Sequence, residues 1–174
     1  MDVGLIVAAD PSWLIGVDGK LPWHYPADLR RFKATTMGGT LILGSRTFYS
    51  LPGPLPGRTT IILSRGGSVP PVWKHHPDVL VNSLGAAIDK AQALGRPIWI
   101  AGGAEVYRAA LTMDVVDFVD LTIVPPFDVK VQPYAQQLTY FPAGQLERYR
   151  RVMVERNTDD DRLCHQRYER PRDT

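Results

Sequence analysis

The stretch VGLIVAADPSWLIGVDGKLPWHYPADLRRFKATTM, residues 3–37, begins with an apolar run and ends with a helical pattern. The run over 3–9 is apolar at nearly every position, which is typical of a strand covered on both faces. The helix predicted over 26–37 opens with Pro26, a residue favoured at the first helical position. Gly16, Gly19 and Pro22 indicate an extended loop between the two elements. The stretch therefore predicts a strand, a loop and a helix, the first half of an α/β unit.

The same alternation continues along the chain. Short β-rich runs predict further strands over 40–44, 59–63, 78–81, 97–101 and 117–124, and helices fit at 46–51, 83–94 and 103–111. Two looser strands, 148–155 and 162–169, flank a hairpin turn at 157–161. We therefore expect an α/β fold, a single domain over residues 1–174. Its central sheet should have eight strands, mostly parallel and twisted, with an antiparallel C-terminal edge strand and about four flanking helices.

Composition excludes several classes of protein. The chain has 174 residues, of which 44% are hydrophobic and 22% charged, and a formal net charge of +2. These values fit one ordinary globular domain, and a single cysteine excludes a disulfide framework or a multi-cysteine zinc site. No basic leader and no apolar run of about 20 residues is present, so we expect a cytoplasmic protein without a membrane segment. Length and compactness favour a monomer.

A basic C-terminal region gives no argument for nucleic-acid binding. Residues 144–172 hold eight arginines but also six acidic residues, so we interpret this region as a solvated pair of strands. His75 and His76 are neighbours in a proline-flanked loop, and an exposed loop is a better interpretation than a metal site. Common nucleotide-binding, metalloprotease and serine-hydrolase motifs are absent: the sequence has no G-x-G, no P-loop, no H-E-x-x-H and no G-x-S-x-G. We expect no metal.

Asp28 is a carboxylate in the middle of an apolar stripe. The residues on one face of the predicted helix are Asp28, Leu29, Phe32 and Thr36. One interpretation is an acid in the first helical turn, where its negative charge interacts favourably with the helix dipole. The other is a carboxylate at the floor of a pocket lined by Ile6, Leu29 and Phe32, where burial raises its pKa and the helix N-terminus lowers it. Such a carboxylate suits a heterocycle that offers an amino group and a ring N–H.

Three predicted strands end in groups suited to phosphates. Arg46 and Thr47 follow Gly44, and Ser64 and Arg65 end the strand over 59–63. Gly102 and Gly103 lie between a strand and a helix, where glycines let backbone amides approach a pyrophosphate; tight strand–helix packing is the alternative explanation. Ligands of α/β sheets bind at the carboxyl ends of strands, so the three together favour a dinucleotide site.

Several of these pieces together resemble the dihydrofolate reductase family. The matching segments are GLIVAA (4–9), IGVDGKLPWHYPADLRRFK (15–33), GSRTFYSL (44–51), PLPGR (54–58), IILSR (61–65), IAGGAEVY (100–107) and LT (121–122), in family order and spacing. The P-W-x-x-P-x-D-x-x-x-F-K block is the most specific of them. The resemblance implies NADPH-dependent reduction of 7,8-dihydrofolate to 5,6,7,8-tetrahydrofolate, with hydride added at C6 and a proton at N5.

The resemblance also implies a role for each matching residue. Asp28 would bind the pterin, assisted by Trp23 and Thr122, and Arg58 would pair with the glutamate α-carboxylate. The apolar residues implied around the substrate are Ile6, Leu29, Phe32 and Leu55. The residues implied around NADPH are Ala8, Leu14, Ile15, Gly16, Gly19, Lys20, Gly44, Arg46, Thr47, Ser64, Arg65, Ala101, Gly102, Gly103, Ala104, Glu105, Val106 and Tyr107.

The sequence departs from the family pattern in two places. Ser45 stands where many members have a basic residue that contacts the 2′-phosphate, and Ala101 stands where a bulkier aliphatic residue is common. Arg30 and Arg31 make the outer face of the helix basic, which we interpret as solvation. Two alternatives stay open: a pyrimidine reductase of riboflavin biosynthesis, which has a related fold, and a non-catalytic nucleotide-binding module.

Overall fold

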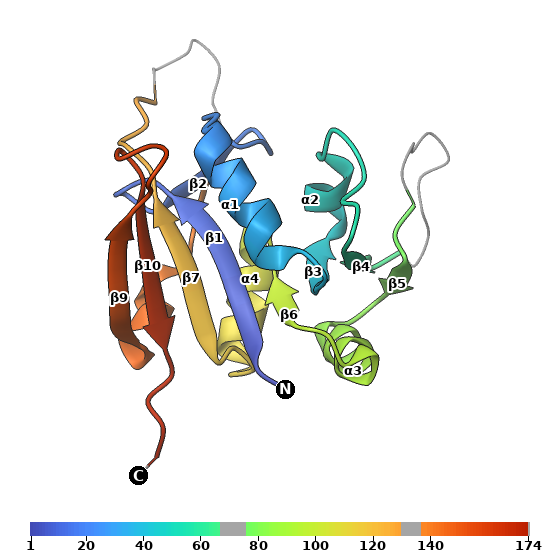
Figure 1. Cartoon of the computed structure of the whole chain (residues 1–174). Coiled ribbons are helices and arrows are strands. Elements are labelled where there is room, and N and C mark those ends of the chain that lie inside the picture. The colour runs from blue at the N-terminus through green and yellow to red at the C-terminus, as the bar shows by residue number, and fades with distance from the viewer. Residues whose placement is uncertain (67–75, 130–136, 174) are drawn as a thin grey trace.

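The computed structural model describes residues 1–66, 76–129 and 137–173 of the chain, and Figure 1 shows its architecture. The strands are β1 (Val3–Ala9), β2 (Leu14–Val17), β3 (Thr40–Gly44), β4 (Thr59–Leu63), β5 (Val79–Val81), β6 (Ile98–Ile100), β7 (Phe118–Ile123), β8 (Leu138–Tyr140), β9 (Arg150–Arg156) and β10 (Cys164–Glu169). The helices are α1 (Pro26–Thr36), α2 (Ser45–Tyr49), α3 (Leu84–Leu94), α4 (Ala104–Thr112) and the 3₁₀ helix η1 (Ala143–Arg148).

The central sheet confirms the predicted fold class. Among the described residues it has eight strands in the order β5-β4-β3-β6-β1-β7-β10-β9. The strands from β5 to β7 pair in parallel, whereas β10 is antiparallel to both β7 and β9. Every predicted strand and helix is present, with ends within two residues of the expected positions. Apolar runs and turn residues were sufficient to locate these elements because each pattern is local.

A second, two-stranded sheet was not predicted. β2 pairs with β8 in antiparallel orientation, so part of the loop expected after the first strand is a strand. A tight turn follows β2, in which Val17 N donates to Lys20 O (2.8 Å) and Lys20 N donates to Val17 O (3.1 Å). Asp18 and Gly19 both have positive φ in this turn. The Asp-Gly dipeptide is a strong sign of such a hairpin turn and was the available signal.

Helices cover both faces of the central sheet. α3 and α4 pack on one face against a cluster that includes Leu5, Val7 and Ile98. The opposite face carries Ile6, Trp99 and Phe48, with Phe32 of α1 packed against them. Figure 1 shows α1 lying across β1 on this second face. Alternate residues of β1 therefore face different layers, which explains why the strand is apolar at nearly every position.

The C-terminal strands are less solvated than predicted. β9 is mostly exposed, but β10 lies between β7 and β9, so its inward side chains are covered. His165 of β10 is 2% exposed. The interpretation of residues 144–172 as a solvated pair is therefore wrong for β10, because charge composition does not show which strand occupies the edge. Within the described part of the chain, no helix is long and apolar enough to cross a bilayer.

Candidate active site

Several predicted site residues lie at the carboxyl edge of the sheet, whereas Arg58 directly precedes β4 and lies at the amino end of that strand. Because β1, β3, β4, β6 and β7 are parallel, their carboxyl ends share that edge. Gly102 follows β6, and Thr122 lies near the end of β7, directly beside Ala8 of β1 in the register. In the order β6-β1-β7, the glycine pair and Thr122 therefore flank the end of one central strand. This topology brings together segments separated by many residues in sequence.

Asp28 is a partly buried carboxylate in the first turn of α1. Desolvation raises its pKa above the ordinary value, and a repulsive contribution from Asp120 acts in the same direction. A hydrogen bond from Thr122 and the charge of Arg31 oppose this shift and lower the pKa. The net rise fits a carboxyl group in a partly buried site better than a solvated acid in the first helical turn.

The apolar residues predicted to line the pocket differ in how far they are buried. Ile6 is 7% exposed, and Phe32 is half-buried and packed against the same cluster. Leu29 is 48% exposed, so its side chain offers apolar surface to a ligand instead of being part of the packed core. Leu55 is half-buried at the margin of the same cluster. Ile6, Phe32 and Leu55 therefore share one apolar cluster, and Leu29 lies outside it.

The Arg31 side chain corrects one of our expectations. Its guanidinium makes a bidentate ion pair with Asp120, with Nη1–Oδ1 at 2.6 Å and Nη2–Oδ2 at 3.0 Å. The two side chains are only 19% and 10% exposed. Arg31 is therefore part of the packing between α1 and β7, whereas Arg30 is 62% exposed. We had assigned Arg31 to the outer face together with Arg30, and its partner Asp120, 89 positions away in sequence, cannot be recognised from the helix alone.

Thr122 has a second polar partner that the sequence analysis missed. Its Oγ1 lies 2.8 Å from Nδ1 of His165, and Nε2 of the same ring lies 2.9 Å from Nδ2 of Asn157. Burial, followed by the charge of Arg31, lowers the pKa of His165. No local pattern in the sequence distinguishes this histidine, because its contact with Thr122 depends on the register between β7 and β10.

Arg58 is held at the end of the proline-rich loop. Its Nε donates to Pro56 O (3.2 Å) and its Nη1 to Thr36 Oγ1 (3.4 Å), and its guanidinium lies 6.0 Å from the centre of the Phe32 ring. Burial lowers its pKa, but an arginine stays charged in proteins. A cavity of about 230 Å³ opens beside Leu55 and Arg58. His76 and the acidic Asp78 line the same cavity.

The glycine pair forms a tightly packed junction between β6 and α4. Gly44 N donates to Gly102 O (2.8 Å), and a Cβ on Gly103 would lie 2.9 Å from Thr47 Oγ1. Gly102 has a φ of 124°, and the Gly102–Gly103 peptide bond is cis. Gly103 caps α4 without a side-chain hydrogen bond, so backbone N–H groups of the first turn remain available to an anion. Packing and ligand binding both demand small residues here.

The other residues around this junction vary in accessibility. Tyr107 Oη donates to Ile6 O (2.8 Å) and thereby joins α4 to β1, so its hydroxyl is already used inside the protein. Val106 is buried, Ala101 and Ala104 are half-buried, and Glu105 is exposed. Ser64 is 9% exposed, while Arg46 and Arg65 are exposed at the ends of the neighbouring strands. Exposed guanidinium groups at this edge are suited to phosphates.

The segment after β1 is anchored by a buried carboxylate. Oδ1 of Asp10 accepts from Ser12 N (2.9 Å), Ser12 Oγ (2.7 Å) and Leu14 N (3.0 Å), and Oδ2 accepts from Phe127 N (3.1 Å). Leu14 is 1% exposed, so only its backbone can reach a ligand. Ile15 is half-buried, Gly16 is buried, and Gly19 and Lys20 are exposed.

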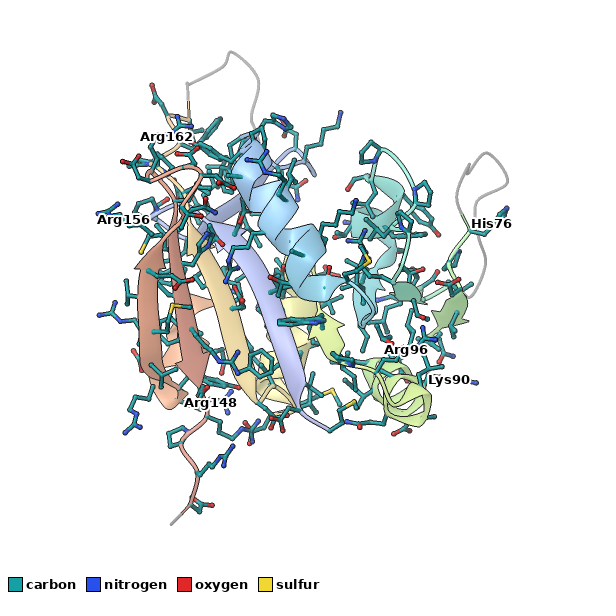
Figure 2. The ribbon with its side chains drawn as sticks, in the orientation of Figure 1. His76, Lys90, Arg96, Arg148, Arg156 and Arg162 are labelled. Carbon is teal, nitrogen blue, oxygen red and sulfur yellow. The ribbon has the colours of Figure 1, made fainter. Side chains whose placement is uncertain are left out.

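Trp23 and the histidine loop lie in different parts of the molecule. Trp23 is half-buried and packs edge-on against Phe127, with ring centres 6.4 Å apart. His76 lies beside β5 in Figure 2, and His75 is outside the described residues. His76 is exposed, in agreement with the predicted loop.

Comparison with known proteins agrees with this arrangement. A family model described as "Dihydrofolate reductase" matches residues 2–170. The type 3 dihydrofolate reductase of Salmonella typhimurium is 41% identical over 115 residues, 64% of this chain and 65% of the relative. The enzyme of Mycobacterium leprae is 40% identical over 114 residues, 64% of this chain and 66% of the relative. The chain thus spans slightly less than two thirds of these relatives.

A solved structure covers more of the fold. Dihydrofolate reductase from Enterococcus faecalis, complexed with NADP(H) and RAB-propyl, superposes with a TM-score of 0.80 and 27% sequence identity. The match covers 98% of this chain and 97% of that one. The similarity therefore includes the C-terminal hairpin, where the sequence motifs were weakest.

Proposed function

The chain belongs to the dihydrofolate reductase family, and we propose that it uses NADPH to reduce 7,8-dihydrofolate to 5,6,7,8-tetrahydrofolate. The observation that carries this proposal is Asp28, a partly buried carboxylate one helical turn before Phe32 on α1, whose pKa is raised by desolvation. A desolvated carboxylate gains most from a ligand with two adjacent N–H donors, which a pterin offers through N3 and its 2-amino group.

The predicted apolar residues and Arg58 account for the rest of the substrate. Ile6, Leu29, Phe32 and Leu55 would contact the pterin and aminobenzoyl rings. Arg58 would pair with the α-carboxylate of the glutamate tail, since a guanidinium matches a carboxylate through two parallel hydrogen bonds. Thr122 would hold Asp28 in the orientation that meets the pterin.

The residues at the glycine junction fit a dinucleotide. Gly103 precedes α4 without a side-chain cap, so the first-turn amides of α4, which begins with Ala104 and Glu105, could bind a phosphate, and Thr47 lies beside both glycines. Arg46, Ser64 and Arg65 would hold the adenosine side, and Ala8, Leu14, Ile15, Gly16, Gly19, Lys20, Gly44, Ala101, Val106 and Tyr107 would shape the remaining contacts. Bound NADPH would supply the hydride that is added at pterin C6.

The protein's own part in the reaction is orientation and electrostatics. Asp28 would bind the pterin and raise the basicity of its ring system, so that N5 accepts a proton from water. Trp23 and the segment over 16–24 would order that water and limit its access. We further propose one domain over residues 1–174, a monomeric state and a cytoplasmic location.

A direct assay tests this function. We expect purified protein to consume NADPH in the presence of dihydrofolate, observed as loss of reduced-nicotinamide absorbance, and methotrexate to abolish the reaction. Turnover of a ribosylated pyrimidine without turnover of dihydrofolate would instead support the riboflavin-pathway alternative. Cofactor binding without any turnover would support a nucleotide-binding module.

Replacing Arg58 tests the proposed carboxylate contact. We expect Arg58→Leu to raise KM for dihydrofolate about 10- to 100-fold, with a smaller change in kcat, because a charge-assisted bidentate pair is lost. Arg58→Lys should recover only part of the affinity, since an ammonium group cannot make the paired geometry. Thermal unfolding of each variant checks that the contacts to Pro56 and Thr36 are not the cause. An unchanged KM would contradict the assignment.

Replacing Arg65 tests recognition of the 2′-phosphate in a chain that has Ser45. We expect Arg65→Ala to weaken NADPH binding about tenfold and NADH binding much less, because only NADPH has the extra phosphate. Lys90→Ala is a matched control, since Lys90 is an exposed cation on α3, away from this edge of the sheet (Figure 2). Equal losses for the two cofactors would show that Arg65 does not read the phosphate.

A further inference from the structure

Asn157, His165 and Thr122 are linked by side-chain hydrogen bonds, and Thr122 is also the side chain whose hydrogen bond lowers the pKa of Asp28. We propose that His165 and Asn157 are positioning residues: they hold the Thr122 hydroxyl with its hydrogen directed at the Asp28 carboxylate, and so keep that acid ready to accept the pterin. The part that concerns the pterin rests on the proposed function. The hydrogen-bonding arrangement itself is a property of the free protein.

The backbone register explains why the two strands bring these groups together. Thr122 of β7 and His165 of β10 are directly paired in the antiparallel ladder, so their side chains leave the same face of the sheet. Both residues are 2% exposed, and Oγ1 of Thr122 lies 2.8 Å from Nδ1 of His165. The same face of β7 carries Asp120, two residues before Thr122. α1 covers this face and supplies Asp28.

The hydrogen bonds of Asn157 determine the direction of the other hydrogen bonds in this group. Oδ1 of Asn157 accepts from the backbone N of Asp159 (2.8 Å) and of Asp160 (3.0 Å). The amide nitrogen of Asn157 must therefore be the atom that faces His165, and it donates to Nε2 at 2.9 Å. An imidazole that accepts at Nε2 carries its hydrogen on Nδ1. His165 consequently donates to Thr122 Oγ1.

This arrangement leaves one choice for the Thr122 hydroxyl. Its oxygen accepts from His165, so its own hydrogen is free to point at Asp28, in agreement with the hydrogen bond that lowers the pKa of that acid. With the opposite tautomer, Nδ1 would accept from Thr122 and Asp28 would lose this donor. The position of one proton on His165 thus decides which way Thr122 donates.

Burial favours the neutral form of the His165 ring, and the surrounding charges act in both directions. The groups that act on His165 are Arg31 from α1, Asp120 from β7 and Glu155, its direct partner on β9. Burial and Arg31 lower the pKa of His165, whereas Asp120 and Glu155 raise it, and the net direction is downward. A neutral ring has one donor and one acceptor, which the two observed contacts use completely.

The first test reads the tautomer directly. The ¹⁵N chemical shifts of His165 in the free wild-type protein at neutral pH should be those of a neutral ring protonated at Nδ1. Asn157→Asp keeps the oxygen that caps the turn but replaces the amide donor with an acceptor, so it should move the hydrogen to Nε2. Thr158→Asp adds the same charge at the next residue, which is exposed, and should leave the tautomer unchanged.

The second test follows Asp28. A ¹³C NMR titration of its carboxyl group should show a midpoint higher by roughly half to one pH unit in His165→Leu and in Asn157→Asp than in the wild type. His165→Asn should restore most of the wild-type midpoint, because an asparagine amide can take the place of Nδ1–H. The pH dependence of binding of a 2,4-diaminopyrimidine should shift in the same direction.

Two results would overturn the proposal. The first is an Nε2-protonated or a charged His165 ring in the wild type, which needs no variant to fold. The second is an Asp28 midpoint that is the same in His165→Leu as in the wild type. Since both are measured without substrate or cofactor, they are distinguishable from failure of the proposed activity, which the dihydrofolate assay alone decides.

Discussion

The Asp28→Asn variant is expected to fold and to lose on the order of 10³-fold of its turnover at neutral pH. Asparagine keeps the size of the side chain but cannot pair with two N–H donors as a carboxylate does, nor raise the basicity of the pterin. Steady-state kinetics with dihydrofolate and NADPH at neutral pH measure the loss. Asp89→Asn, the same change at an exposed position on α3, should have wild-type rates.

The activity of Asp28→Asn is expected to depend on pH. As the pH falls, solvent acid protonates more of the substrate, so the activity of Asp28→Asn should recover toward the wild-type value. Ionisation of Asp28 lowers the free energy of unfolding, whereas ionisation of a typical paired surface acid raises it. The difference arises because burial raises the pKa of Asp28. The ionised form disfavours folding, so Asp28→Asn should be more stable than the wild type at neutral pH. This advantage should disappear as the pH falls toward the pKa of an unfolded aspartate.

Either of two outcomes would contradict the role of Asp28. Wild-type turnover of Asp28→Asn at neutral pH would show that the carboxylate is not needed for the reaction. A constant deficit at every pH would show that the acid does not act through protonation of the substrate. Circular dichroism of the variant separates both outcomes from simple misfolding.

The second large effect is expected at the ion pair between Arg31 and Asp120. Asp120→Leu should lower the free energy of unfolding by about 3–4 kcal/mol, because it leaves the Arg31 charge uncompensated in a largely covered position. The double variant Arg31→Met with Asp120→Leu should lose far less, about 1 kcal/mol or below, because it removes both charges and keeps apolar volume. Urea unfolding of the two variants and the wild type measures the difference.

A neighbouring exposed pair is the control for this experiment. Arg30 lies beside Arg31 on α1, but its contact with Asp159 is 3.7 Å long and the two side chains are 62% and 64% exposed. Arg30→Met should therefore change the free energy of unfolding by less than about 0.5 kcal/mol. A double variant as unstable as Asp120→Leu would show that the packing of residue 120, and not the unpaired charge, causes the loss.

Much of the candidate site was predictable from the sequence. Asp28, Arg58, Thr122 and the glycines at 102–103 lie in motifs whose residues are close together in the chain. Their family order and spacing identify them even when the elements between them are placed only to within two residues. The same local patterns predicted the parallel strands, and parallel strands bring their carboxyl ends to one edge without further information. The Asp18-Gly19 dipeptide is an equally local signal for a hairpin turn, but the sequence analysis assigned the whole segment between the first strand and the first helix to one extended loop.

The sequence by itself therefore determined the fold class and the sheet edge at which the glycine pair and Thr122 lie, and it predicted the residues expected to bind a ligand, because periodicity and motif spacing are short-range properties. Only the tertiary structure decided that Arg31 pairs with Asp120 and that His165 stands behind Thr122. These contacts join residues 89 and 43 positions apart. They depend on which strand lies beside β7, on the register between the two strands and on how α1 packs across them. None of these three relations can be predicted from the neighbouring sequence, so the charged groups around Asp28 could be identified only from the folded chain.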